Sequence, residues 1–154
     1  MGMDCYGENP KLISEKPIQP DFSTISEDDK QEYFNALAKF EEDNPGVYFR
    51  NNVWWWRPLW NYVCETCSDI LSVEDMQAGQ YNDGYLIDAE QSKKIAELLG
   101  HELLSGRTAD YEEEYRRASD TFAPDDMRSK YPFTEDNVIE FQAFVQNSGG
   151  FRIC

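Results

Sequence analysis

Residues 49–67 read FRNNVWWWRPLWNYVCETC, and they contain all four tryptophans of the chain. The segment 47–56, which overlaps the first half of this stretch, is rich in β-branched and aromatic residues and therefore predicts a strand. Pro58 suits the first turn of a helix, where its missing N–H needs no partner, so a helix is predicted from Arg57 to about Ile70. The direction in which each tryptophan points depends on the residue at which the strand ends and the helix begins.

The predicted strand places two indoles beside polar groups. Successive side chains of a strand point to opposite faces, so Arg50, Asn52, Trp54 and Trp56 would share one face, next to Arg57. Indoles stack on planar rings, arginines bind phosphate and an amide hydrogen-bonds the edge of a base, so these five residues predict a site for a planar anionic ligand. In the alternative interpretation, the tryptophans form the core and the arginines stack on them as cation–π partners.

The chain as a whole predicts a mainly α fold of the α+β class, with about five helices. Ser26, Asp88, Thr108 and Thr134 each precede a segment with helical periodicity and are expected to cap it. The expected helices cover 26–42, 57–70, 89–105, 108–118 and 135–148, and a small two- or three-stranded sheet is expected from 47–55, 81–87 and 151–153.

Length and composition predict one domain. At 154 residues, the chain is of ordinary size for a single compact unit. Residues 1–25 hold three prolines among polar residues and predict an irregular arm, so 26–154 are expected to form a single acidic domain. No apolar run is long enough to cross a membrane, and the first residues lack the pattern of a secretory signal. Four cysteines without such a signal indicate reduced thiols in a cytoplasm.

The charge of the chain restricts its partners. With 30 acidic and 14 basic residues, the net charge is −16. Nucleic-acid backbones and anionic membrane surfaces are therefore disfavoured as partners, whereas a basic protein is permitted. Acidic runs in the predicted helices 26–42 and 108–118 indicate either solvated faces or a surface that imitates nucleic acid for a basic host protein.

Metal and catalytic signals are sparse. Cys64 and Cys67 have the spacing of a metal or redox pair, but a structural zinc site usually needs four ligands. Zinc would require Cys5 and Cys154 to join this pair, with the two ends of the chain packed together. Buried or plain surface thiols are the alternative, and the sequence therefore predicts no cofactor. His101, the single histidine, lies at the edge of an apolar stripe without a nucleophile motif.

Several motifs resemble those of an uncharacterised family of small bacteriophage and prophage proteins. The family similarly combines a YFRNNVWWWRPL-like block with an Asn-Asp-Gly segment, a helix ending in Ser-Gly, an F-(S/T)-x-x-N-V helix and a terminal SGGFxIC. In this chain these motifs occupy 48–59, 82–84, 104–106, 133–138 and 148–154. The resemblance implies a phage setting and supplies no reaction, and the acidic helix at 26–42 lies outside it.

These observations together predict a protein that acts by binding. The first hypothesis is a non-enzymatic phage accessory protein in the host cytoplasm, a host-defence antagonist that sequesters a nucleotide-type small molecule. The second is an acidic inhibitor that docks on a basic host protein, and the third is a metal-supported enzyme. A homo-oligomer is compatible with each.

Overall fold

A computed structural model describes all residues from 1 to 154, and it confirms the α+β class. Each of the five expected helices is present, and a sixth short helix, α3, was not expected. The α-helices are α1 (Glu27–Asp43), α2 (Val53–Thr66), α3 (Val73–Ala78), α4 (Ala89–Leu104), α5 (Arg107–Ser119) and α6 (Glu135–Asn147), and a 3₁₀ helix, η1, covers Met127–Lys130.

The sheet has four antiparallel strands, one more than the largest number predicted. The strands are β1 (Gly2–Gly7), β2 (Tyr48–Asn52), β3 (Tyr85–Ile87) and β4 (Phe151–Ile153), in the spatial order β2-β1-β4-β3. The extra strand is β1, so the prediction of an irregular arm over 1–25 is wrong for its first residues. β1 is a central strand because it pairs with β2 on one side and with β4 on the other.

The core lies between the sheet and the helices. Inward side chains of the strands, including Phe49 and Phe151, meet Phe141 and Phe144 of α6. These four rings lie 5.2–6.1 Å apart between centroids and join α6 to two strands. Part of the aromatic share of the composition thus fills this core.

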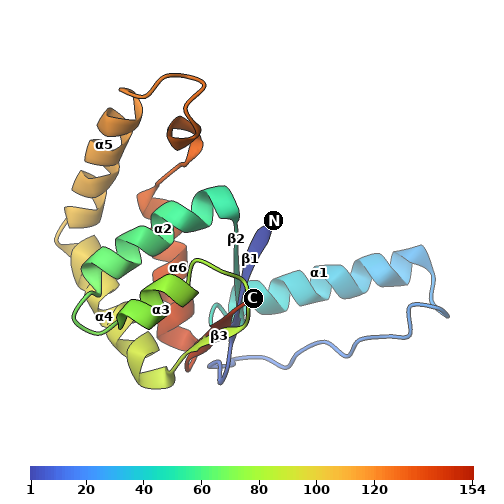
Figure 1. The fold of residues 1–154 in the computed structure, drawn as a ribbon. Coiled ribbons are helices and arrows are strands. Elements are labelled where there is room, and N and C mark those ends of the chain that lie inside the picture. Colours follow the sequence, from blue (N-terminus) through green and yellow to red (C-terminus); the bar gives the residue numbers. More distant parts are fainter.

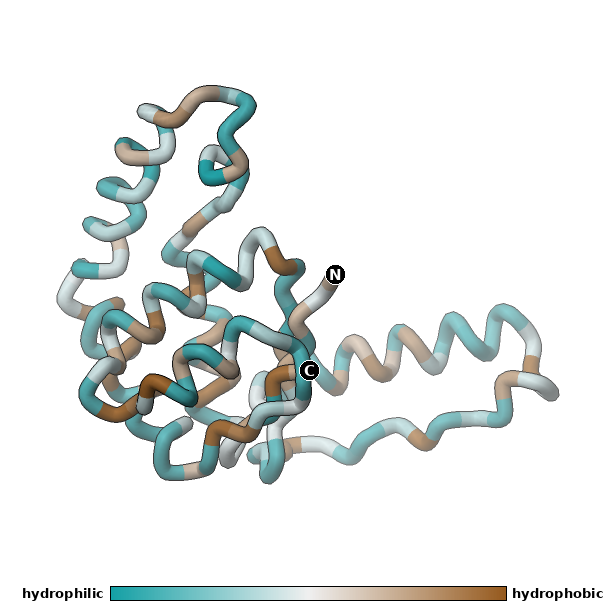
Figure 2. The backbone as a smooth tube through the Cα atoms, viewed as in Figure 1, coloured by the Kyte–Doolittle hydropathy of each residue, from teal (hydrophilic) through white to brown (hydrophobic).

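Helix α1 extends away from this core, and the coil that precedes it runs back alongside it (Figure 1). We call residues 11–43, which comprise this coil and α1, the projection. Phe40 is the one residue of α1 that is buried. Figure 2 shows hydrophobic residues scattered among hydrophilic ones along the projection.

The helix starts follow the expected side chains at three of four positions. Ser26, Asp88 and Thr134 each accept a hydrogen bond from a backbone N–H of the first turn, as predicted. Thr108 does not cap α5, because that helix begins one residue earlier and the Thr108 hydroxyl is buried against Tyr62. No helix has both the length and the apolar character required to span a bilayer.

Candidate functional site

The structure does not form the predicted ligand face, because α2 begins earlier than predicted. Strand β2 ends at Asn52, and α2 begins at Val53 rather than at Arg57. The Asn52 side chain accepts hydrogen bonds from the backbone N–H groups of Trp54 and Trp55, both over 3.1 Å, and so caps the helix. Asn52 thus uses its amide oxygen on the backbone of its own chain.

The helical geometry also separates the tryptophans. Residues of a helix are rotated by about 100° from one to the next, so Trp54 and Trp56 do not share a face as they would in a strand. Trp56 is fully buried, and its ring stacks on that of Trp60, which is equally buried. The core interpretation therefore holds for Trp56 and Trp60, and the prediction of Trp56 as a ligand-binding residue is wrong.

Arg50 points to the outer face of the sheet, away from α2. Its Nε lies 3.5 Å from a carboxylate oxygen of Asp4 on the neighbouring strand. The same carboxylate accepts a hydrogen bond from the Tyr48 hydroxyl, and burial together with this bond raises the pKa of that hydroxyl. Arg50 is thus paired with a carboxylate of the protein and lies apart from the other predicted residues.

Arg57, by contrast, is exposed on α2 and is free of carboxylates. It takes part in none of the ion pairs of the protein. One of its terminal nitrogens donates a hydrogen bond to the Tyr131 hydroxyl over 2.9 Å, and its guanidinium carbon lies 6.0 Å from the centre of that ring. Trp54 contacts the same tyrosine, with 5.0 Å between ring centroids. Two of the five predicted residues therefore meet, through a tyrosine that lies outside every predicted helix and strand.

A cleft of about 370 Å³ opens beside Arg57, between α2, the end of α5 and the loop that contains η1. Arg57 and Arg128 both line it, so it contains two guanidinium groups. Its aromatic lining comes from α5 and from the segment after it. The lining consists of Arg57, Pro58, Asn61, Glu65, Tyr111, Tyr115, Ala118, Ser119, Phe122, Arg128 and Tyr131.

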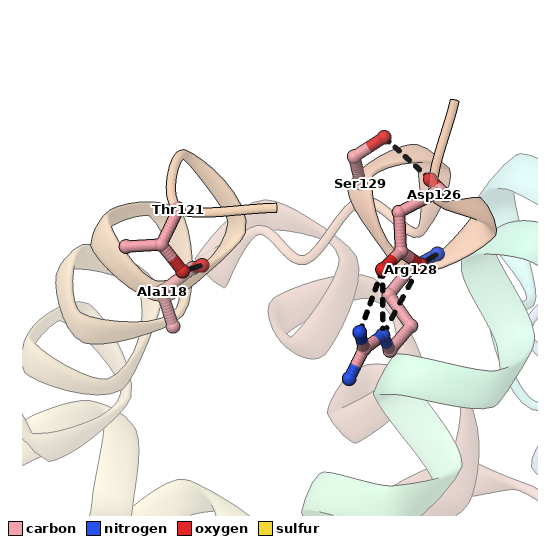
Figure 3. Close-up of polar contacts among 5 residues, drawn as sticks. All are labelled: Ala118, Thr121, Asp126, Arg128 and Ser129. Atoms are coloured by element: carbon pink, nitrogen blue, oxygen red, sulfur yellow. Dashed lines mark hydrogen bonds and ion pairs between the residues drawn. The ribbon is translucent and has the colours of Figure 1, made fainter. Parts of the chain in front are cut away.

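The loop between α5 and η1 is held by local hydrogen bonds (Figure 3). Thr121 donates to the carbonyl of Ala118 over 2.6 Å and so closes the end of α5. Ser129 donates to the carbonyl of Asp126 over 2.7 Å within η1. Arg128 binds both carboxylate oxygens of Asp126, and its guanidinium carbon lies 4.3 Å from the centre of the Phe122 ring. The charge of Arg128 is thus neutralised locally, which leaves Arg57 as the cleft cation without an anionic partner.

Tyr111 and Tyr115 are neutral hydrogen-bonding groups of the cleft. Burial, and then the nearby carboxylate of Glu65, raises the pKa of Tyr111 to about 12. Burial also raises the pKa of Tyr115, whose hydroxyl donates to the Tyr131 carbonyl over 2.8 Å. Their rings lie 6.3 Å apart and nearly parallel, at an interplanar angle of 26°. The cleft therefore offers aromatic surfaces, hydroxyls and the Glu65 carboxylate beside a single unpaired cation.

Sequence reasoning missed most of this cleft. It interpreted the acidic helix 108–118 as either a solvated face or a nucleic-acid mimic and assigned no role to 120–132, yet these segments supply the aromatic lining. The available signal was the pair Tyr111 and Tyr115, which at a spacing of four must share one face of a helix. The partner rings Phe122 and Tyr131 carried no such signal, because only the folded loop brings them back to α5.

The cysteines lie in two places: Cys64 and Cys67 at the end of α2, and Cys5 and Cys154 in or next to the neighbouring strands β1 and β4. Cys5 and Cys67 are buried, and Cys64 and Cys154 are partly buried. No three histidine, cysteine, aspartate or glutamate side chains are arranged to hold a metal ion, so the arrangement that zinc would require of the four thiols is not formed. Burial, and then a neighbouring negative group, raises the pKa of Cys64 and of Cys67 to about 12, so both are protonated at neutral pH. Protonated thiols are weak nucleophiles, which fits a packing role.

The acidic runs differ between the two helices that carry them. On α5, Glu113 pairs with Arg116 and, over 3.0 Å, with Arg117, so part of the acidic charge is neutralised. On α1, Lys30 and Lys39 pair with Glu27 and Asp43 respectively. Five further carboxylates of α1 form no ion pair: Asp28, Asp29, Glu32, Glu41 and Glu42.

Comparison of the chain with protein families, curated proteins and solved structures finds no match.

Proposed function

We propose that this protein is a non-enzymatic phage accessory protein that captures a nucleotide-type small molecule in the cleft between α2, α5 and η1. The observation that carries the proposal is Arg57. In a protein of net charge −16, this exposed guanidinium has no carboxylate partner and lies at the edge of an aromatic cleft. Such a group attracts an anion, and the rings beside it offer stacking surfaces for a planar heterocycle.

The dimensions and the lining of the cleft agree with one small ligand. Ligand pockets typically measure about 300–1,000 Å³, and this cleft lies near the lower end of that range at about 370 Å³. In the proposed complex, a phosphate binds Arg57 and the base lies against the rings of Tyr111, Tyr115 or Tyr131. The Glu65 carboxylate and the Asn61 amide then accept hydrogen bonds from the amino groups of the base.

The biological setting rests on the resemblance to bacteriophage and prophage proteins. In that setting, a protein that binds a nucleotide without turning it over acts as a host-defence antagonist in the cytoplasm of the host, by lowering the free concentration of a signal. Capture by mass action requires the protein to be at least as abundant as the signal and to bind it more tightly than the host receptor does.

Calorimetric titration with a panel of mononucleotides and cyclic dinucleotides tests the proposal. The unmodified protein is expected to bind at least one member and to release it unchanged on denaturation. Arg57→Gln should weaken that binding by roughly 10- to 100-fold, because a charge-assisted hydrogen bond is lost. Arg50→Gln is the matched control, since Arg50 is equally exposed but lies on the outer face of the sheet, paired with Asp4. Absence of heat across the panel would reject the proposal, and equal loss in both variants would reject the cleft as the site.

A further inference from the structure

The projection is held at its base. The buried Asn44 side chain accepts a hydrogen bond from the backbone N–H of Ile13 over 2.7 Å and donates one to the Ser14 hydroxyl over 2.8 Å. The backbone N–H of Lys11 donates to the carbonyl of Asn147 at the end of α6, also over 2.8 Å. These bonds fix the direction in which α1 leaves the core (Figure 1).

Beyond its base, the projection is in contact mainly with itself. Phe22 of the coil lies 5.6 Å from both Tyr33 and Phe34 of α1, measured between ring centroids. These three rings join the coil to α1, but they do not cover the other apolar side chains of the two segments. The side chains of Leu12, Ile13, Ile18 and Phe34 remain 52%, 75%, 93% and 50% exposed. All four belong to the projection, and covering exposed apolar side chains is what a docked partner contributes.

The charge of the projection indicates which partner fits. It carries nine carboxylates and four lysines, a net charge of −5. A second copy of the same chain would bring another −5 to the same surface, within a whole protein of −16, so self-association is opposed by repulsion. A partner must therefore supply positive charge for the carboxylates and apolar side chains for the exposed isoleucines and Phe34.

We infer that the projection is a docking surface for a cationic amphipathic segment of another protein. Such a segment presents apolar side chains on one face, which cover Ile18 and Phe34. Lysines or arginines at its margin meet Glu41 and Glu42, which lie two turns further along α1 on the side of Phe34. This surface is independent of the cleft, since the projection extends from the sheet away from α5 (Figure 1) and shares no residue with the cleft.

Binding of a synthetic amphipathic Lys/Leu helix, followed by fluorescence anisotropy, tests the inference. The probe should bind the full-length protein, and its affinity should fall as sodium chloride is raised, because exposed charge pairs are screened. A scrambled peptide of the same composition should bind on the order of tenfold more weakly, since its leucines no longer form one face. Equal binding of the two peptides would overturn the inference, because it would show attraction by charge alone.

Paired variants locate the surface. Glu41→Gln combined with Glu42→Gln should weaken binding by on the order of fivefold, as expected for two charge pairs at the surface. The control, Glu97→Gln with Glu140→Gln, removes the same charge from exposed positions of α4 and α6 and should leave binding unchanged. Ile18→Ser with Phe34→Ser should weaken binding without altering its salt dependence. Equal effects of the two charge variants, or a concentration-dependent dimer in sedimentation that excludes the peptide, would overturn the inference.

Discussion

The indole rings of Trp56 and Trp60 are stacked in the core, with 5.5 Å between their centroids and 10° between their planes. Each also donates its ring N–H to a backbone carbonyl near α3: Trp56 to Gly79 over 2.8 Å, and Trp60 to Met76 over 3.0 Å. The stack therefore holds the unexpected short helix α3 against α2, and the ring nitrogens, which burial would otherwise leave unpaired, are satisfied.

Gly79→Ala should destabilise the protein because the stack leaves no room for a methyl group. A Cβ at Gly79 would lie 2.1 Å from Cε2 of Trp60, so the ring or the backbone must move. We expect a loss of about 1–3 kcal/mol in the free energy of unfolding, measured by urea denaturation. The control is Gly100→Ala in α4, where the nearest atom would be 3.5 Å away and the helix should gain up to about 1 kcal/mol. Similar effects at both glycines would contradict the role of the stack.

The carboxylate of Asp75 should make stability depend on pH at the acidic end. Burial raises its pKa, but hydrogen bonds from Ser72, Tyr85 and Gln91 outweigh burial, so the net pKa is lowered. A depressed pKa stabilises the fold fully above the unfolded value of about 3.9, and this contribution disappears as the pH falls through the folded value. Between pH 5 and pH 7, Asp75 should contribute no pH dependence.

Asp75→Asn isolates this contribution from those of the other carboxylates. At pH 7 the variant should be less stable by about 1–3 kcal/mol, since buried donors lose a charged acceptor. Its deficit relative to the unmodified protein should shrink as the pH is lowered from 5 to 2.5 in urea denaturation. Asp83→Asn is the control, because Asp83 is exposed and accepts no hydrogen bond. A deficit that stays constant over this range would contradict the assignment.

Helix α1 should open locally, well before the rest of the protein unfolds. It buries Phe40 alone, whereas α6, which is shorter, buries five residues against the sheet and α4. Isolated helices of this length are marginally stable in water, so tertiary contacts decide their protection. In native-state hydrogen exchange, amides near the middle of α1 should exchange by an opening that is insensitive to low denaturant, and those of α6 by global unfolding. Equal protection of the two helices would contradict this prediction.

Addition of the amphipathic Lys/Leu peptide at a saturating concentration should slow amide hydrogen exchange in α1. Slower exchange confined to the projection would show directly where the peptide lies. Slower exchange in α5 instead would place the peptide on the other acidic helix.

The sequence by itself determined the local features of the fold. Ser26, Asp88 and Thr134 predicted three helix starts correctly, because a capping side chain acts on backbone groups within three residues of itself. Periodicity predicted the helices themselves for the same reason, since it depends only on neighbours along the chain. The α+β class followed from these elements.

Tertiary structure decided what depends on distant partners. Gly2–Gly7 is a strand only because β2 and β4 lie on either side of it, and no local pattern reports those neighbours. Asn52 caps α2, which begins at Val53, although valine is a residue type that favours a strand. Because the helix begins at Val53 rather than at the predicted Arg57, the side chain of Trp56 points into the core. Arg57 was singled out from the sequence, but the rings of its cleft, Tyr115, Phe122 and Tyr131, come from positions 58 or more residues further along, which only packing brings to α2.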